Sequence, residues 1–157
     1  MMKTNDIAKM ILEGCLLTAG NIDNHNTMTI GWGQIGTIWG KEVFVCYVRP
    51  NRYTYQFMEE NDYFTISFYD SSYRNAMGIL GTKSGRDTNK EAEVNFHPVD
   101  VDGITTTFKE AKLSLVCKRI YKQDLDASQV ISEVKNKYYA KEPFHRLYIG
   151  EIVKVIE

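Results

Sequence analysis

The chain has 157 residues, of which 43% are hydrophobic and 25% are charged, as in an ordinary globular protein with a single domain over residues 1–157. Its 19 basic and 20 acidic residues leave a net charge of −1 without long cationic runs, which argues against binding to nucleic acid. The sequence has no secretory signal and no apolar stretch near the length of a membrane span, so we expect a cytoplasmic protein that contacts no membrane. Cys15, Cys46 and Cys117 lie among apolar residues without a CxxC spacing, and we expect them to be small core side chains.

The first half of the chain combines strands with short helices. A helix at about residues 5–13, capped by Asn5 or Asp6, is expected to turn Ile7 inward and to end at Gly14. Further elements are strands at residues 15–19, 26–32, 42–48 and 64–68, and helices at residues 51–60, capped by Asn51, and 71–80. The apolar run at 42–48 indicates a strand buried on both faces, whereas the alternation at 64–68 indicates a half-buried strand.

The second half is expected to hold a polar loop at residues 81–89, strands at 113–117 and 146–156, and one amphipathic helix. That helix begins at a capping box formed by Asp126 and Gln129 and extends to Tyr138. Gly150 marks a bulge in the last strand, because the apolar phase shifts there. Six or so strands without regular strand–helix–strand alternation favour an antiparallel, Greek-key-like β-barrel with helical decorations over a doubly wound sheet.

The common catalytic constellations are missing from the sequence. Its three histidines are far apart, and no HExxH, CxxC or Gly-x-Ser-x-Gly motif occurs, so we expect neither a metal site nor a serine hydrolase. The run Gly31-x-Gly33-x-x-Gly36 matches the dinucleotide fingerprint, but Trp32 fills its first variable position. The acidic residue expected about 20 positions further on is also missing, so a Rossmann-type site is disfavoured.

Two polar segments could instead receive an anion. Residues 49–54 lie at a predicted strand-to-helix junction, where free N–H groups and the hydroxyl of Thr54 could bind a phosphate beside Arg52. Residues 82–90 add three cations and three hydroxyl side chains around Gly85. Either segment alone could be an ordinary surface loop, but two of them in a nearly neutral protein favour an anion site.

Six stretches of the sequence resemble the flavin reductase-like (flavoredoxin-type) family. They are Asn26-Thr27-Met28-Thr29-Ile30-Gly31-Trp32-Gly33, Trp39-Gly40, Val48-Arg49-Pro50-x-Arg52-Tyr53-Thr54-Tyr55, Phe64-Thr65-Ile66-Ser67-Phe68, Ser84-Gly85-Arg86-Asp87-x-x-Lys90 and His145-x-Leu147-Tyr148-Ile149-Gly150-Glu151-Ile152. Together they span about residues 10–155 in the family's order. The resemblance implies an FMN-binding split β-barrel that works as a homodimer, with FMN near the interface.

The resemblance also implies roles for individual residues. The strand at residues 26–32 would line the flavin ring with Thr29 close to it, and His145 would lie at the reactive face, where a nicotinamide could stack. The residues assigned to the cofactor are Asn26, Met28, Thr29, Ile30 and Trp32 at the ring, and Arg49, Arg52, Tyr53, Thr54, Thr82, Ser84, Gly85, Arg86 and Lys90 in the two polar segments. More ordinary roles stay open: Trp32 and Trp39 could be core or interface aromatics, Asp87 could only pair with Arg86, and His145 could only hydrogen-bond at a strand end.

Several functions fit these expectations. The leading one is an FMN-dependent oxidoreductase that takes electrons from NAD(P)H or a protein donor, since FMN accepts hydride at N5 and needs no side-chain nucleophile. The alternative is an FMN-binding electron carrier without pyridine-nucleotide activity of its own. A barrel that stacks single-stranded nucleic acid on its many aromatics is a third possibility, which the net charge disfavours. A deazaflavin could also replace FMN.

Overall fold

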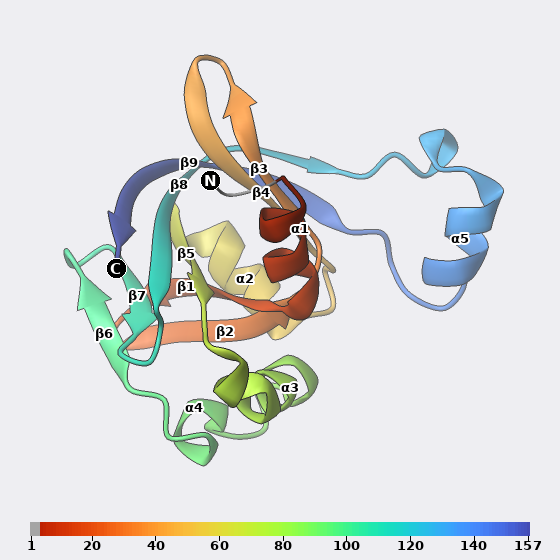
Figure 1. Ribbon diagram of the computed structural model, residues 1–157. Coiled ribbons are helices and arrows are strands. Elements are labelled where there is room, and N and C mark those ends of the chain that lie inside the picture. Colours follow the sequence, from red (N-terminus) through yellow and green to blue (C-terminus); the bar gives the residue numbers. More distant parts are fainter. Residues whose placement is uncertain (1–3) are drawn as a thin grey trace.

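Nine strands, five α-helices and two 3-10 helices make up residues 4–157, the part of the chain that the computed structural model describes (Figure 1). In chain order these are α1 (Thr4–Glu13), β1 (Cys15–Asn21), β2 (Asn24–Ile30), β3 (Gly33–Ile38), β4 (Lys41–Val48), α2 (Tyr53–Glu60), β5 (Tyr63–Phe68), the 3-10 helix η1 (Ser71–Tyr73), α3 (Arg74–Thr82), α4 (Lys90–Glu93), β6 (Pro98–Val101), β7 (Thr105–Phe108), β8 (Leu113–Asp124), the 3-10 helix η2 (Ala127–Gln129), α5 (Ser132–Tyr138) and β9 (Arg146–Ile156). None of the described helices has the length and apolar composition that a membrane span requires.

Seven strands form one antiparallel sheet in the order β2-β1-β5-β8-β9-β4-β3, and β6 and β7 pair as a separate hairpin. The long strands β8 and β9 join the two halves of the sheet, which curves around the core. The β3–β4 hairpin projects from the barrel, and the segment that carries α5 extends away from it between β8 and β9 (Figure 1). This arrangement confirms the predicted antiparallel barrel with helical decorations.

Both faces of β1 are buried, which explains its nearly continuous apolar sequence. Leu17 and its alternate neighbours face the main core, in which Phe44, Phe64 and Tyr148 are fully buried. Leu16 points to the other face, where it packs against a smaller apolar cluster from α3 and β7. The three cysteines are buried and free, as expected for small core side chains.

Two strand predictions need correction, and the β6–β7 hairpin was not predicted. The alternating strand, now β5, is not half-buried: Thr65 and Ser67 are fully buried beneath this hairpin. Thr65 donates its hydroxyl hydrogen to the carbonyl of Thr106 at 2.7 Å, and the Ser67 hydroxyl lies 3.0 Å from that of Thr107. Strand β3 was also missed, since its glycines and threonine give no apolar alternation.

Three helix predictions also need correction. Asn51 does not cap α2, because the N-cap is Arg52. The Asn51 side chain instead donates a hydrogen bond to Glu142. The predicted amphipathic helix is broken into η2 and α5, and Asp126 accepts from the Ser128 N–H rather than forming a capping box with Gln129. Most of this helical segment is solvent-exposed, and at its end Tyr138 packs against Trp32. Helix α1 is present, but it already includes Thr4, so Asn5 and Asp6 lie within the helix and do not cap it. The side chains of Asn5 and Ile7 lie outside the described ones.

The predicted irregularity at Gly150 exists, although its extra residue lies in the opposite strand. Arg119 pairs with Gly150 and Tyr121 with Ile149, so that Ile120 in β8 is the inserted residue. Gly150 itself serves close packing, because a Cβ there would overlap the ring of Phe64.

Candidate functional site

Two adjoining cavities form a groove along β2, between the start of α2 and the loop that follows α3. The first, the aromatic cavity, has a volume of about 210 Å³ and is lined by Met28, Thr29, Ile30, Gly31, Trp32, Tyr47, Arg49, Arg52 and His145. The second, the cationic cavity, has a volume of about 310 Å³ and is lined by Asn26, Met28, Asn51, Arg52, Tyr53, Thr54, Gly81, Thr82, Lys83, Ser84, Arg86 and Lys90. Met28 and Arg52 line both cavities, so the two are neighbours at these residues.

The groove therefore brings together the residues that the sequence singles out. Of the predicted cofactor residues and His145, all line one of the two cavities except Gly85, which packs directly behind Asn26. A Cβ at Gly85 would overlap the Asn26 side-chain oxygen, so only glycine lets the loop approach β2 this closely. The fit of this loop against the strand gives the cationic cavity its shape.

Lys90 is the most unusual charge in the groove. Only 3% of its surface is exposed, and its ammonium group donates to the carbonyls of Leu80 at 2.9 Å and Lys83 at 3.0 Å. Within the described residues no carboxylate pairs with it, and burial and the neighbouring Arg52 lower the pKa of Lys90 to about 8. A buried cation without a counter-ion is costly, and an anion in the cavity would offset that cost.

A second cation faces the same space. Arg52 is half-buried and donates to the carbonyl of Gly81 at 2.9 Å. Burial, followed by the nearby Arg49, lowers the pKa of Arg52. Within the described part of the chain, no acidic side chain lines the cationic cavity. Its electrostatics therefore favour a bound anion.

The start of α2 supplies hydrogen-bond donors. The Thr54 hydroxyl accepts a hydrogen bond from the Asn26 side-chain amide at 2.8 Å, so its own hydrogen stays free to donate. The first N–H groups of a helix have no partner within the helix, and the first turn of α2 carries no acidic residue. Phosphate is the chemical group that this combination of N–H donors, hydroxyl and cations fits best.

The loop after α3 is held by contacts of its own. Arg86 lies over the ring of Tyr53, with its guanidinium carbon 4.8 Å from the ring centroid, and the Arg86 N–H donates to the Ser84 hydroxyl at 3.2 Å. The pairing of Asp87 with Arg86 that we considered is absent from the ion pairs of the described residues. The hydroxyl of Thr82 donates to the carbonyl of Gly78, which ties it to α3.

The aromatic cavity is walled by rings. The ring centroids of Trp32 and His145 are 5.0 Å apart, and those of Trp32 and Tyr138 are 5.1 Å apart. His145 is 7% exposed and lies 2.7 Å from the Tyr139 hydroxyl through Nδ1. Burial and the nearby Arg49 lower the pKa of His145 to about 4, so the imidazole is neutral at neutral pH. A flat aromatic ligand fits such a wall.

Thr29 and the two tryptophans take particular places around the groove. The Thr29 hydroxyl donates to the carbonyl of Met77 at 2.6 Å and so fixes β2 to α3. Trp32 is 41% exposed beside the cavity, which argues against a core role. Trp39 is 60% exposed at the tip of the β3–β4 hairpin, where its φ of 52° is unusual for a tryptophan.

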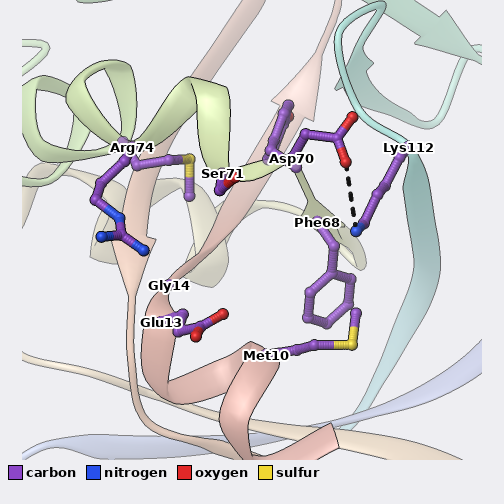
Figure 2. A pocket seen from close by; sticks show the side chains of 10 residues that line it. Met10, Glu13, Gly14, Phe68, Asp70, Ser71, Arg74 and Lys112 are labelled. Carbon is purple, nitrogen blue, oxygen red and sulfur yellow. Dashed lines mark ion pairs between the residues drawn. The ribbon is translucent and has the colours of Figure 1, made fainter. Parts of the chain in front are cut away.

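A third cavity, of about 270 Å³, lies behind the groove between α1 and the connection from β5 to α3 (Figure 2). Thr29, Gly14 and Met77 separate it from the aromatic cavity, and no predicted cofactor residue lines it. It contains carboxylates as well as cations, including the pair formed by Lys112 and Asp70 at 3.6 Å. It is therefore less suited to an anion than the cationic cavity.

Sequence reasoning missed some residues of the groove. Tyr47, Asn51, Gly81 and Lys83 line it but were not singled out individually. Tyr139, which contacts His145, gave no usable signal because it lies in an expected helix end rather than in a family-like stretch. Tyr47 could have been found from its position beside Arg49 at the end of an apolar strand.

Comparison with known proteins adds an independent line of evidence. The sequence matches the family model described as flavin reductase like domain over residues 12–157. A search of curated proteins found no significant match.

Solved structures share the fold. Flavoredoxin from Methanosarcina acetivorans superposes with a TM-score of 0.71 at 21% identity, over 92% of this chain and 67% of that chain. Flavoredoxin of Desulfovibrio vulgaris (Miyazaki F) superposes with a TM-score of 0.70 at 22% identity, over 91% of this chain and 68% of that chain. The FMN-binding protein from Thermus thermophilus with bound 1-cyclohex-2-enone superposes with a TM-score of 0.68 at 16% identity, over 92% of this chain and 69% of that chain. The fold is the split β-barrel of these proteins, and the chain belongs to the flavin reductase-like domain family.

Proposed function

We propose that this protein is an FMN-dependent oxidoreductase whose groove holds the cofactor, with the flavin ring in the aromatic cavity and the phosphate in the cationic cavity. One observation carries this proposal: an aromatic-walled cavity adjoins a cavity that is lined, among the described residues, by the buried Lys90 and by no carboxylate. Membership of the flavin reductase-like family and the similarity to a Thermus thermophilus FMN-binding protein support it.

The residues of the cationic cavity would hold the phosphate. Lys90, Arg52 and Arg86 line this cavity and would supply positive charge, Arg86 from the loop after α3. The Thr54 hydroxyl and the first N–H groups of α2 donate hydrogen bonds, which are stronger toward a charged acceptor. A deazaflavin phosphate would meet the same donors.

The residues of the aromatic cavity would position the ring. The β2 residues from Met28 to Ile30 line the cavity and would offer backbone groups to the ring, and the rings of Trp32 and His145 form the aromatic wall. When bound, FMN accepts and releases hydride or single electrons, which no side chain of the groove can do. The protein then needs to orient the ring, leave one face open and place N–H donors or cations near the pyrimidine edge.

The donor side would be the wall formed by Trp32 and His145. A neutral imidazole can donate one hydrogen bond without adding charge beside Arg49, which suits the carboxamide of NADH or NADPH. A protein donor would need the same open face. An FMN-binding electron carrier without pyridine-nucleotide activity is the alternative.

We also propose that the protein is a homodimer. The exposed Ile35 on β3 and Val155 on β9 line an apolar cavity of about 330 Å³, and the exposed Trp39 lies at the tip of the same β3–β4 hairpin. An exposed apolar surface of this kind is typical of an interface, and aromatic side chains are its usual anchors. A second subunit would cover this face and shield the cofactor.

Anaerobic spectroscopy tests the proposed function. The protein, purified or reconstituted with FMN, is expected to show flavin absorbance, and NADH or NADPH is expected to bleach it. A protein that binds no FMN in a titration overturns the flavoprotein proposal. A protein that binds FMN but is bleached only by dithionite is the electron carrier of the alternative.

A further inference from the structure

The position of Tyr139 beside His145 is not explained by FMN binding alone. Both residues belong to the excursion at residues 125–145, which leaves the sheet after β8 and returns at β9 (Figure 1). The Tyr139 hydroxyl oxygen lies 2.7 Å from His145 Nδ1. The Tyr139 ring stacks on Phe144, with centroids 4.1 Å apart and an interplanar angle of 12°. This stacking holds the phenol at the imidazole.

Arg49 fixes the backbone around this pair. Its guanidinium donates to the carbonyl of Pro143 at 2.7 Å and to that of Tyr138 at 3.1 Å, and its central carbon lies 5.0 Å from the Tyr139 ring centroid. One residue at the end of β4 thus ties two points of the excursion to the barrel. The Tyr139 hydroxyl is therefore held in place by the fold rather than by chance contact.

The Tyr139 hydroxyl and His145 Nδ1 are hydrogen-bond partners, and the tautomer of the imidazole sets the direction of this bond. Among the described residues the hydroxyl has no other acceptor, so a phenol that donates to the protein donates to Nδ1. When Nδ1 accepts, a neutral imidazole carries its proton on Nε2.

The Nε2 atom opens to the cavity. It has no hydrogen-bond partner among the described residues. If Nε2 were also buried, it would be one of the buried side-chain atoms without a partner, but among the described residues these are only Tyr69 Oη and Thr105 Oγ1. Nε2 is therefore accessible, and His145 lines the aromatic cavity. In the Nε2–H tautomer, a free N–H donor faces the space where the ring and the electron donor would meet.

We infer that Tyr139 is a positioning residue that fixes His145 as the Nε2–H tautomer, so that the imidazole donates a single hydrogen bond into the aromatic cavity. The inference rests on the proposed function for its ligand. A donor of this kind selects a carbonyl oxygen, as in a carboxamide, and disfavours an amine or ammonium group at that point.

The surroundings keep the imidazole neutral. The charged and titratable groups that face it are Arg49 at the end of β4, Tyr47 on β4, Tyr139 on the excursion and Arg52 across the cavity. None of the residues lining this cavity is a carboxylate that would favour the imidazolium form. The tautomer is therefore the property that Tyr139 controls.

Nitrogen NMR tests this inference without any turnover. Long-range ¹H–¹⁵N spectra of the ¹⁵N-labelled protein show which imidazole nitrogen carries the proton, and the chain has only three histidines, which His25→Gln and His97→Gln assign. At pH 7 we expect a single Nε2–H tautomer for His145. Tyr139→Phe is expected to mix the two tautomers. Tyr138→Phe, which removes the neighbouring hydroxyl, is expected to keep the wild-type spectrum.

The outcomes separate this inference from the proposed function, because the spectra can be recorded with and without FMN. A proton on Nδ1 in the wild type, or unchanged His145 nitrogen shifts in Tyr139→Phe, overturns the inference even if the protein proves to be a flavin reductase. In stopped-flow reduction by NAD(P)H, Tyr139→Phe is expected to be slower by about fivefold, the effect of one ordinary hydrogen bond, with FMN affinity unchanged. An unchanged rate removes the hydrogen bond from donor recognition.

Discussion

At the scale of single residues, the phosphate end of the groove depends most on Lys90. Lys90→Met is expected to weaken FMN binding by about 1.5–3 kcal/mol, the range for a hydrogen bond to a charged group, and to affect riboflavin far less. Titrations with both flavins measure this difference. Lys83→Met is a matched control, because Lys83 also lines the cavity but is paired with Glu93 at 2.6 Å. Equal losses for FMN and riboflavin would show that Lys90 does not bind the phosphate.

The pKa of Lys90 adds a pH dependence to FMN binding. Because the flavin-free protein holds this pKa at about 8, the ammonium form that binds phosphate is depleted as the pH rises above 8. Bound phosphate would raise the pKa of Lys90 in the complex. We therefore expect the FMN affinity of the wild type to fall as the pH rises from about 8 to that higher pKa. In Lys90→Met the weaker affinity should not change over the same range. Fluorescence titrations from pH 7 to about 9.5 compare the two.

His145 is expected to serve the electron donor rather than the retention of FMN. His145→Ala should keep the flavin spectrum and the FMN affinity, while reduction by NAD(P)H slows by roughly tenfold, or about 1.4 kcal/mol. Since its pKa is about 4, the wild-type rate should not change through titration of His145 above about pH 5. Stopped-flow reduction over donor concentration and pH measures both effects. A variant that simply loses FMN would place His145 in cofactor binding instead.

At the scale of elements, two glycines of the α3 region give opposite expectations. Gly85→Ala would push the loop away from Asn26, so it should weaken FMN binding. Gly78 lies within α3 and its Cβ position is open, so Gly78→Ala should stabilise the protein by about 0.5–1 kcal/mol through helix propensity. Denaturant unfolding and FMN titration of the two variants separate the effects. Unchanged FMN affinity in Gly85→Ala would contradict the role of this close approach.

Glu59 joins α2 to β8 and β9. Burial raises its pKa, but hydrogen bonds from Lys122, Tyr148 and Arg146 outweigh this and lower the pKa to about 2. The ionised form therefore adds stability above the ordinary pKa of 4.5, and this contribution is lost as the pH falls from there toward 2. Glu59→Gln should lower the unfolding free energy at pH 7 and flatten its loss between pH 5 and pH 2. Urea unfolding at several pH values checks this, with the exposed Glu60 replaced by glutamine as the control.

The elements that could be predicted from sequence are those with a local signal. Apolar runs predict β4 and β9, and clustered cations beside turn residues indicate the two segments of the cationic cavity. The β6–β7 hairpin could not be predicted, because its threonines are buried through contacts with a strand some 40 residues away. The contact of Tyr139 with His145 was missed for a similar reason, since it depends on how the excursion folds back through Arg49.

At the scale of the whole molecule, the exposed apolar face beside the β3–β4 hairpin predicts a homodimer. Trp39 follows β3 at the tip of the hairpin, is 60% exposed, and has its ring centroid 5.9 Å from that of Tyr121 on β8. Burying this ring in a second subunit would remove a large apolar surface from water, whereas a charge there would oppose association.

Trp39→Asp should therefore convert the protein from a species of twice 18.1 kDa into a monomer of 18.1 kDa. Ile131→Asp is the matched control, since Ile131 is 65% exposed on the excursion, away from this face, and should leave the dimer intact. Sedimentation at micromolar concentrations measures the mass, and a parallel titration measures FMN affinity, which should fall in the monomer if the partner shields the cofactor. A wild-type protein that sediments only at 18.1 kDa with flavin bound would exclude both the dimer and a shared site.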